Sequence, residues 1–220
     1  MIKKNKGTLI LTSIVLLIPI LIGLILWNQL PDQIPSHWDI NGEVDGWSSK
    51  AFTVFGFPCL LLVLHWVCVL ASSADPGSKN YHPKMLHLVL WTCPVISLVL
   101  NALVYTAALG YQLNIEIIMP LLVGLMFIIV GNLLPKCRQS YTLGIKLPWT
   151  LANEENWNKT HRFGGKLWVV GGVITMATAF VGSFWILLGV LIVMVAAPTI
   201  YSYCLYRKQK RNQRSDEDDS

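Results

Sequence analysis

The sequence predicts an all-α membrane protein with six transmembrane helices and both termini in the cytoplasm. The 220-residue chain is 54% hydrophobic and only 13% charged, which is about half the charged fraction of soluble domains. Six segments are apolar over the roughly 20 residues that a spanning helix needs. The Lys and Arg residues gather on alternate connections, which is typical of cytoplasmic loops.

The six predicted spans are residues 8–30, 52–73, 85–109, 115–134, 166–182 and 184–206. The N-terminal apolar run is longer than the ~7–15 residues of a signal peptide, and no small-residue cleavage site follows it, so we interpret it as the first span. The fifth span is short. Only Gly182-Ser183 separates it from the sixth, so we expect these two helices to form a tight hairpin.

The distribution of positive charge predicts the orientation. With both termini inside, Lys50 is the one residue among the 17 Lys and Arg that lies outside. The opposite orientation would place the other sixteen outside, against the positive-inside rule. The connection that contains residues 144–166 is therefore predicted to face the cytoplasm, and the connection after the first helix is predicted to be extracellular.

The small extracellular loop, residues 30–50, carries four acidic residues and one lysine, a net charge of −3. Pro31 and Pro35 rule out a continuous helix. The turn pairs Asn41-Gly42 and Asp45-Gly46 favour a small hairpin. The loop is either a rigid cap or an acidic surface that meets a cationic peptide. Its candidate outward-facing residues are His37, Trp38, Asp39, Glu43, Asp45 and Trp47.

A metal site in this loop is an alternative. Carboxylates suit a hard cation, and an imidazole could add a ligand for zinc. The spacing matches no calcium loop, and the loop has a single histidine. We therefore predict neither a metal nor another cofactor; the residues that a metal would use are His37, Asp39, Glu43 and Asp45.

A short amphipathic helix is predicted in the cytoplasmic loop 135–165, within the sequence ANEENWNKTHRFGG. Asn153 is a suitable N-cap, and Gly164 a suitable left-handed C-cap. Glu155 and Lys159 are four residues apart and can pair. Trp157, Thr160, His161 and Gly164 share one face by helical periodicity.

This loop supplies the second set of candidate residues. The face could lock the fourth and fifth helices together, dock a cytoplasmic protein or bind an anionic headgroup. We predict no catalytic residue, because no serine or cysteine lies near His161 within the helix and Cys137 would have to fold back beneath it. The candidates are Lys146, Pro148, Trp149, Trp157, Lys159, Thr160, His161 and Arg162.

Polar residues inside the predicted spans are expected to make interhelical hydrogen bonds. His65 and Asn101 lie at different depths, so they are not expected to pair as a proton relay. Gly171, Gly172 and Ala179 in the fifth span predict close packing against the sixth or fourth helix.

Two blocks of the sequence resemble the SdpI immunity family of bacteria. The first, LPDQIPSHWDINGEVDGWSSK, is similar to the LPxxIPxHWxxxGxxDxW signature of the domain that commonly precedes the SdpI module. The second, GNLLPK followed by GIKLPWTLANEENWNKTHRFGGKLW, is similar to the module's G-I-R-x-P-W-T-L, W-x-K-T-H-R and G-G-K pattern. Lys146 stands where arginine is usual, so the bidentate fork of arginine is lost.

The resemblance implies a multi-pass immunity protein of the bacterial plasma membrane that protects the cell from a secreted, SdpC-like toxic peptide. In the best-known case of the family, the protein also signals by holding an ArsR-type repressor at the membrane, without direct contact with nucleic acid; the resemblance does not imply this second role for every relative. The predicted division is an N-terminal membrane domain at 1–112, an SdpI-like module at 113–206 and, from its composition, a disordered charged tail at 207–220. The alternative is a small membrane enzyme or transporter that acts on an anionic lipid or peptide.

Overall fold

The computed structural model describes residue 2 and residues 5–218, and it divides the chain into two compact units. The first unit contains the residues up to Ala74 together with Pro83–Ile118. The second contains Asp75–His82 and the chain from Met119 onward. Within the described residues, six helices are long and apolar enough to cross a membrane, in agreement with the predicted number.

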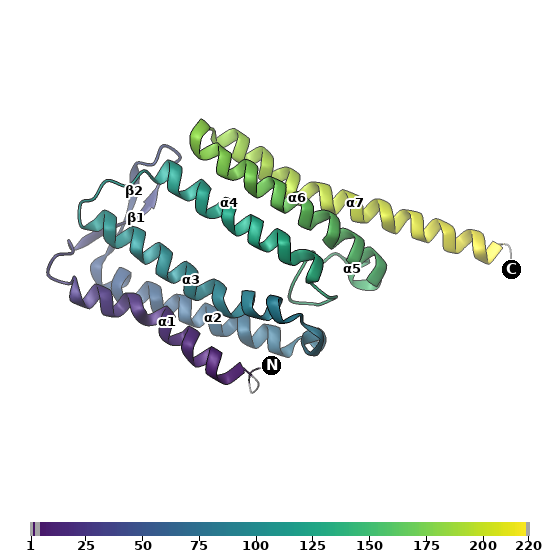
Figure 1. The fold of residues 1–220 in the computed structure, drawn as a ribbon, viewed down its shortest axis with the longest axis horizontal. Helices are drawn as coiled ribbons and strands as arrows, with labels where there is room; N and C mark the ends of the chain where they lie inside the picture. The colour runs from purple at the N-terminus through teal and green to yellow at the C-terminus, as the bar shows by residue number, and fades with distance from the viewer. Residues whose placement is uncertain (1, 3–4, 219–220) are drawn as a thin grey trace. The chain divides into compact units, whose positions relative to one another are not determined.

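The first unit is a bundle of the helices α1 (Lys6–Ile25), α2 (Phe57–Ala74) and α3 (Pro83–Ala108) (Figure 1). A π-helical turn at Phe52–Gly56 leads into α2. Buried apolar side chains from all three helices form the core, and polar contacts join them inside the apolar layer. The Tyr105 hydroxyl donates to the Pro19 carbonyl at 3.0 Å, and the Ser97 hydroxyl donates to the Leu16 carbonyl at 3.1 Å.

His65 makes the interhelical hydrogen bond that was predicted for it. The hydroxyl of Thr12 in α1 donates to its own helix, at the Leu9 carbonyl, so its oxygen accepts from Nε2 of His65 at 3.3 Å. Asn101 differs from the prediction, because its side-chain amide donates within α3 to the Ser97 carbonyl at 2.8 Å. Interior polar groups of a helix often bond to a carbonyl one turn earlier in this way.

A two-stranded antiparallel sheet follows α1. Strand β1 (Gln33–Trp38) pairs with β2 (Val44–Ser49), and Ile34 at its base is fully buried. The turn lies at Asn41-Gly42, as predicted, with Gly42 at φ +77°. The second predicted turn pair, Asp45-Gly46, is instead part of β2, where Gly46 pairs with His37. A glycine at this position allows the two strands to approach closely, because an added Cβ would lie 2.8 Å from the Cβ of His37.

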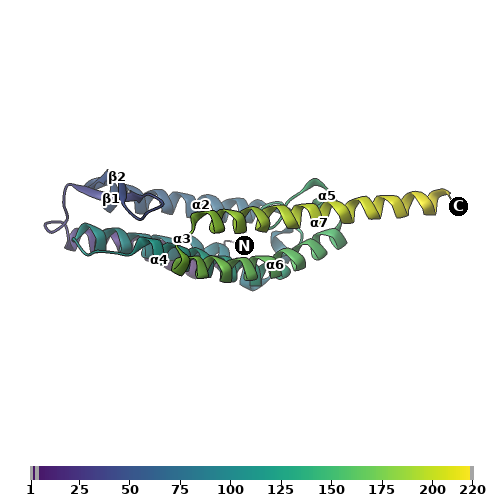
Figure 2. The ribbon, with the colours of Figure 1, turned by 90° about the horizontal axis from the view of Figure 1, so that it is seen from above.

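The second unit contains most of α4 (Ile115–Leu133), the short α5 (Pro148–Ala152), α6 (Glu154–Val181) and α7 (Phe184–Asp218). Helices α6 and α7 run antiparallel side by side, and α7 continues past the start of α6 (Figures 1 and 2). Gly182 has φ +65° and ends α6, which confirms the predicted break between the last two helices.

Helices α4 and α6 approach each other at pairs of glycines. A Cβ at Gly124 would lie 2.6 Å from the Gly172 carbonyl oxygen, and a Cβ at Gly131 would lie 2.8 Å from that of Gly165. Backbones come this close only where no side chain intervenes. On the α7 side, Gly171 faces Met194, so the small residues of the fifth span pack against both neighbours, as expected.

Two predicted boundaries of the second unit were wrong. The predicted amphipathic helix does not end at Gly164: it is the first part of α6, which runs without interruption from Glu154 to Val181. Gly164 and Gly165 lie inside the helix, where their missing side chains leave room for Ile145, Pro198 and Pro135. The segment after residue 206, predicted to be disordered, continues α7 as helix to Asp218, since no glycine or proline interrupts the polar run.

Candidate functional site

The tip of the hairpin (residues 33–49) is organised by Asp39. Its carboxylate accepts the backbone N–H groups of Asn41 at 2.8 Å and Glu43 at 2.9 Å. The hydrogen bond from the Glu43 N–H is the main cause that lowers the pKa of Asp39. Desolvation opposes it, and the hydrogen bonds from Asn41 add to the lowering. Asp39 is therefore an anion that holds the turn, and its oxygens face the hairpin's own backbone.

The other charged residues of the hairpin point outward. His37 Nδ1 donates to Asp45 Oδ1 at 2.5 Å across the two strands, and both side chains are exposed. Glu43 is exposed, and Trp47 is 58% exposed, whereas Trp38 is half-buried. The accessible part of the predicted outer set thus contains His37, Glu43, Asp45 and Trp47.

The single lysine of this loop is held at the base of the hairpin. Lys50 Nζ lies 3.3 Å from an Asp32 oxygen and donates to the Trp27 carbonyl at 3.3 Å. The same ammonium lies 5.2 Å from the centre of the Trp27 ring, within reach of a cation–π contact. Because these contacts occupy Lys50, the exposed tip of the hairpin is acidic.

The arrangement of side chains in the fold does not support the alternative of a metal site in the hairpin. Across the described part of the chain, no three residues among His, Cys, Asp and Glu are grouped so that they could hold a metal ion. In the hairpin, His37 and Asp45 meet as a pair, and the carboxylate of Asp39 is directed to the turn.

The second candidate set lies in the second unit, around the connector (residues 134–153) and the start of α6. Asn153 caps α6, as predicted, by accepting the Asn156 N–H at 2.8 Å. Glu155 and Lys159 form the predicted pair at 2.6 Å. These local features follow from spacing alone: the cap precedes the helix, and the pair is separated by one turn.

Trp157 and His161 share a helix face, as predicted, and the connector covers that face. Trp157 is 0% exposed, and its Nε1 donates to the Cys137 carbonyl at 2.8 Å. His161 is 1% exposed, and its Nε2 accepts the backbone N–H of Ile145 at 2.9 Å. Since Nε2 accepts, the ring hydrogen is on Nδ1, which donates to the Trp157 carbonyl at 2.8 Å. His161 is therefore a neutral imidazole with both nitrogens engaged.

The connector passes close over these rings at Gly144. Its φ is +104°, and an added Cβ would lie 2.4 Å from His161 Nε2. The rings of Trp157 and His161 stack with their centres 4.1 Å apart. Glycine supplies both requirements here, the left-handed backbone and the absence of a side chain.

Two threonines complete the buried set. The Thr150 hydroxyl accepts the Leu147 N–H at 2.9 Å and lies 2.9 Å from the Ile145 carbonyl, to which it donates. The Thr160 hydroxyl donates to Asn156 Oδ1 at 3.0 Å. Asn156 Nδ2 in turn donates to the Ser202 carbonyl of α7 at 3.0 Å. The buried polar groups thus join the connector, α6 and α7.

The remaining predicted residues of this set lie at the surface. Lys146, Pro148, Lys159 and Arg162 are exposed. Trp149 is half-buried against α7, where its Nε1 donates to the Ser202 hydroxyl at 2.9 Å. The predicted set therefore divides into buried members that hold the connector and exposed members, of which Lys146 and Pro148 lie on the connector and Lys159 and Arg162 lie on α6.

Sequence reasoning missed Asp75. Its carboxylate accepts the backbone N–H groups of Tyr141 and Thr142, both at 2.9 Å, and the Ser140 hydroxyl at 2.7 Å. The Tyr81 hydroxyl and the Gly77 N–H also donate to it. Asp75 thereby ties residues 75–82 to the connector. The Asp-Pro-Gly sequence signals only the local turn, since Asp side chains commonly bond the backbone two residues on.

The surroundings of Asp75 decide its charge. Burial by itself would raise its pKa, but the hydrogen bonds from Ser140, Thr142, Gly77 and Tyr81 outweigh burial and hold the pKa well below its ordinary value. Burial and the charge of Asp75 raise the pKa of the Cys137 thiol to about 12. Cys137 is thus a protonated thiol at neutral pH, which is the unreactive form.

The comparisons with known proteins agree with the two blocks of sequence described above. The model of the SdpI/YfhL protein family matches residues 136–202, and a domain of unknown function, DUF1648, matches residues 14–62. The immunity protein SdpI of Bacillus subtilis (strain 168) is 31% identical over 209 residues, which cover 94% of this chain and 97% of that protein. No solved structure matches the chain.

Proposed function

Because the chain belongs to the SdpI/YfhL protein family and is a multi-pass bacterial membrane protein, we propose that it is an immunity protein that protects the cell from a secreted toxic peptide. The observation that carries the proposal is the 31% identity to the immunity protein SdpI across nearly the full length of both chains. That match extends over 94% of this chain, so it is not confined to one of the two candidate sites.

In this proposal the hairpin is the extracellular surface that meets the toxin. The positive-inside rule places it outside, where its exposed tip offers Glu43 and Asp45, beside the aromatic face of Trp47. The Lys50 cation is held at the base of the hairpin by Asp32 and Trp27. An acidic surface of this kind attracts a cationic peptide, and the attraction weakens as salt increases.

We extend the proposal to the cytoplasmic side, where the exposed face of α6 would hold an ArsR-type repressor. The buried face cannot dock a partner in this conformation, because Trp157 and His161 are covered by the connector. Lys146 on the connector and Arg162 on α6 are exposed and basic, and they support a docking surface on the exposed parts of these two segments. A change in the connector would alter what α6 exposes.

The proposed role is non-enzymatic. An acid–base or nucleophilic site needs a reactive group with a free reaction partner. In the candidate site, His161 uses both ring nitrogens for structural hydrogen bonds. The Cys137 thiol is protonated and donates to the Leu143 carbonyl. These contacts favour immunity over the enzyme alternative.

The test is survival of a toxin-sensitive bacterium that produces this chain and is challenged with an SdpC-like peptide. We expect growth at peptide concentrations that kill cells with an empty vector. Membrane fractions probed by immunoblot establish that the chain is produced. Equal killing of both strains, with the chain present in the membrane, would contradict the immunity proposal.

Repressor binding is tested separately. Cells that carry a fluorescent fusion of an ArsR-type repressor are imaged with and without toxin. We expect the fusion to move to the membrane only when toxin and this chain are both present. The double variant Lys146→Gln/Arg162→Gln should abolish the movement while survival is kept. If the variant loses both, the separation into two surfaces is wrong.

A further inference from the structure

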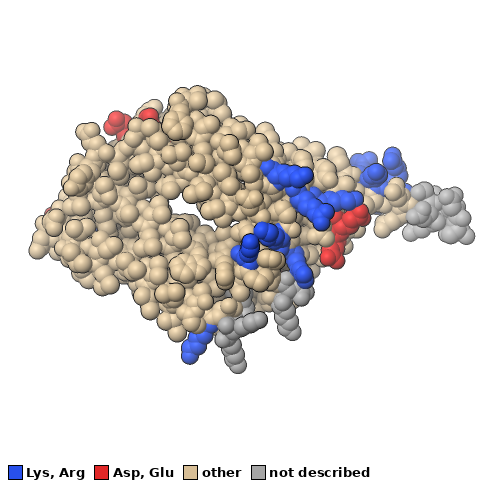
Figure 3. All heavy atoms as spheres, in the orientation of Figure 1, with Lys and Arg blue, Asp and Glu red and all other residues tan. Residues whose placement is uncertain are grey.

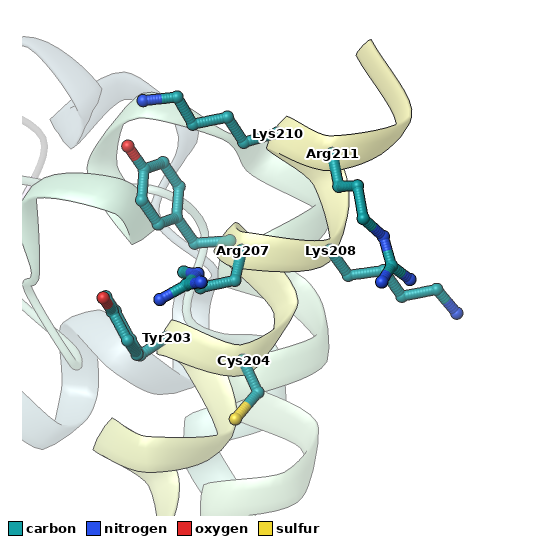
Figure 4. A pocket seen from close by; sticks show the side chains of 7 residues that line it. Tyr203, Cys204, Arg207, Lys208, Lys210 and Arg211 are labelled. Carbon is teal, nitrogen blue, oxygen red and sulfur yellow. The ribbon is translucent and has the colours of Figure 1, made fainter. Parts of the chain in front are cut away.

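The C-terminal part of α7 carries a surface hollow that the immunity proposal leaves unused. Its volume is about 940 Å³, within the ~300–1,000 Å³ of sites for small ligands. In Figure 4, Tyr203, Arg207 and Lys210 project to one side of the helix, and Lys208 and Arg211 project to another. The helix thus has two flanks with two cations each.

None of these four cations is neutralised by a carboxylate among the described side chains. The side of α7 that meets the start of α6 carries the neutral Gln209, which donates to Asn153 and Glu155. The basic flanks therefore face away from the acids of α6. Figure 3 shows Lys and Arg side chains gathered along the first part of α6 and the last part of α7.

The hollow lies at the depth of lipid headgroups. Twenty helical residues span roughly 30 Å, the thickness of the hydrocarbon core. Counted from Phe184, where α7 begins, that length ends at Tyr203. Arg207 then lies about 6 Å beyond it and Lys210 about 10 Å beyond it. The headgroup layer is roughly 5–7.5 Å thick on each side of the core, so the backbone of Arg207 lies within it. Lys210 lies just beyond it, and its long side chain can reach back to the headgroups.

An aromatic cluster supports the same depth and braces one flank. Trp149 stacks on Tyr206 with ring centres 6.0 Å apart and meets Tyr203 edge-on at 5.4 Å. Trp and Tyr gather where hydrocarbon meets water. The cluster holds Tyr203, which lies one turn before Arg207 on the same flank, whereas the flank with Lys208 and Arg211 has no aromatic ring among its lining residues.

We propose that the flank formed by Tyr203, Arg207 and Lys210 binds the phosphate of an anionic phospholipid headgroup. The planar guanidinium of Arg207 matches a phosphate in bidentate geometry, and Lys210 adds a point charge one turn away. Tyr203 contributes a hydroxyl at the hydrocarbon boundary. The flank with Lys208 and Arg211 has the same charge without the aromatic brace, and it contributes general attraction to an anionic surface.

The experiment compares lipid selectivity of the full chain in phosphatidylcholine nanodiscs. Spin-labelled phosphatidylglycerol and spin-labelled phosphatidylcholine report, by electron paramagnetic resonance, the fraction of each lipid immobilised at the protein. Wild-type protein is expected to prefer phosphatidylglycerol. Arg207→Gln/Lys210→Gln should lower that preference by up to roughly fivefold per cation, the factor equivalent to ~1 kcal/mol per Lys or Arg.

Lys208→Gln/Arg211→Gln is the matched control, because it removes the same charge from the same helical turns. It should retain most of the preference. Equal losses in both double variants would overturn the site in favour of the general field of the helix. The lipid site would also be overturned, in favour of a protein partner, by a different pair of results. These are an unchanged preference of Arg207→Gln/Lys210→Gln for phosphatidylglycerol and a protein crosslinked at position 207 in cells.

Two further measurements distinguish lipid binding from the two remaining explanations, which are unfolding of a variant and binding of free phosphate. Gel filtration and thermal unfolding in detergent must match wild type for both double variants. If Arg207→Gln/Lys210→Gln unfolds, it is replaced by Arg207→Lys/Lys210→Arg, which keeps the charge. That variant should bind lipid with altered selectivity. Inorganic phosphate titrated into wild-type nanodiscs distinguishes lipid from free phosphate. Displacement of phosphatidylglycerol by millimolar phosphate would overturn the assignment to a lipid.

Discussion

The imidazole of His161 accepts the backbone N–H of Ile145 at 2.9 Å, so a helix residue is directly bonded to the connector sixteen positions before it in the chain. The bond defines a neutral tautomer, since Nδ1 must then donate to the Trp157 carbonyl. It also explains why this part of the loop needs glycine at position 144, where the backbone passes against the ring.

Replacing His161 with phenylalanine should loosen the connector. Phe keeps a ring against Trp157 but leaves the buried Ile145 N–H without an acceptor, which costs about 1–3 kcal/mol. We expect lower thermal stability in detergent and faster proteolysis between residues 137 and 147. His87→Phe, at an exposed position of α3, is the control and should leave both unchanged. Identical behaviour of the two variants would refute the role assigned to His161.

Asp75 predicts a specific dependence on pH. Its pKa is lowered in the folded protein, so its contribution to stability is complete above the ordinary carboxyl pKa and is lost as the pH falls through the folded value. Protection of the connector from an acid-stable protease should therefore persist from neutral pH to about pH 4 and decline only below it.

The variant Asp75→Asn removes this dependence. An amide cannot accept as many hydrogen bonds as the carboxylate, and hydrogen bonds to charged groups contribute about 1.5–3 kcal/mol. Connector protection should be weaker at neutral pH and should not decline further in acid. A wild-type profile in Asp75→Asn would show that Asp75 does not hold the connector.

The glycine contacts between α4 and α6 predict strong sensitivity to small additions. At Gly131 a methyl group would lie 2.8 Å from the Gly165 carbonyl oxygen and the Val169 nitrogen. Gly131→Ala should destabilise the protein by about 1–3 kcal/mol through forced separation of the helices. Gly189→Ala is the control: nothing lies within 4 Å of its Cβ position, so it should be neutral or stabilise by up to about 1 kcal/mol. Thermal unfolding in detergent measures both.

The exposed acids of the hairpin predict how protection depends on charge. Glu43→Gln/Asp45→Asn should lower the toxin concentration that cells survive by several-fold. The difference from wild type should be smaller at high salt, because salt screens the attraction between the acidic tip and a cationic toxin. Asp32→Asn removes an exposed acid that pairs with Lys50 at the base and should have less effect. Full protection by the double variant would exclude an electrostatic role of the tip.

The predicted orientation can be tested by labelling single cysteines in intact cells. In a chain whose native cysteines are replaced by alanine, Glu43→Cys should react with a membrane-impermeant maleimide. Arg162→Cys should react only after the membrane is permeabilised. Both positions are exposed in the structure, so accessibility within the fold does not limit the comparison. Labelling of position 162 in intact cells would reverse the assignment of surfaces to partners.

Local features of the fold were predictable from sequence because they depend on neighbours in the chain. Hydropathy over about 20 residues located the spans. Asn153 was recognisable as an N-cap, and Glu155 with Lys159 as a pair, from their spacing. The start of the fifth membrane helix was placed twelve residues late, since polar residues 154–165 resemble a separate surface helix when the covering connector is unknown.

The composition and order of residues were sufficient to identify a six-helix membrane protein, its hairpin and the shared face of Trp157, Thr160 and His161. Only the tertiary structure determined what that face contacts. Helical periodicity states which residues lie on one side of a helix, but it does not state whether lipid, a partner or the chain's own connector covers that side. The same holds for Asp75, whose carboxylate bonds residues more than sixty positions away. Contacts over that distance arise only when the helices pack.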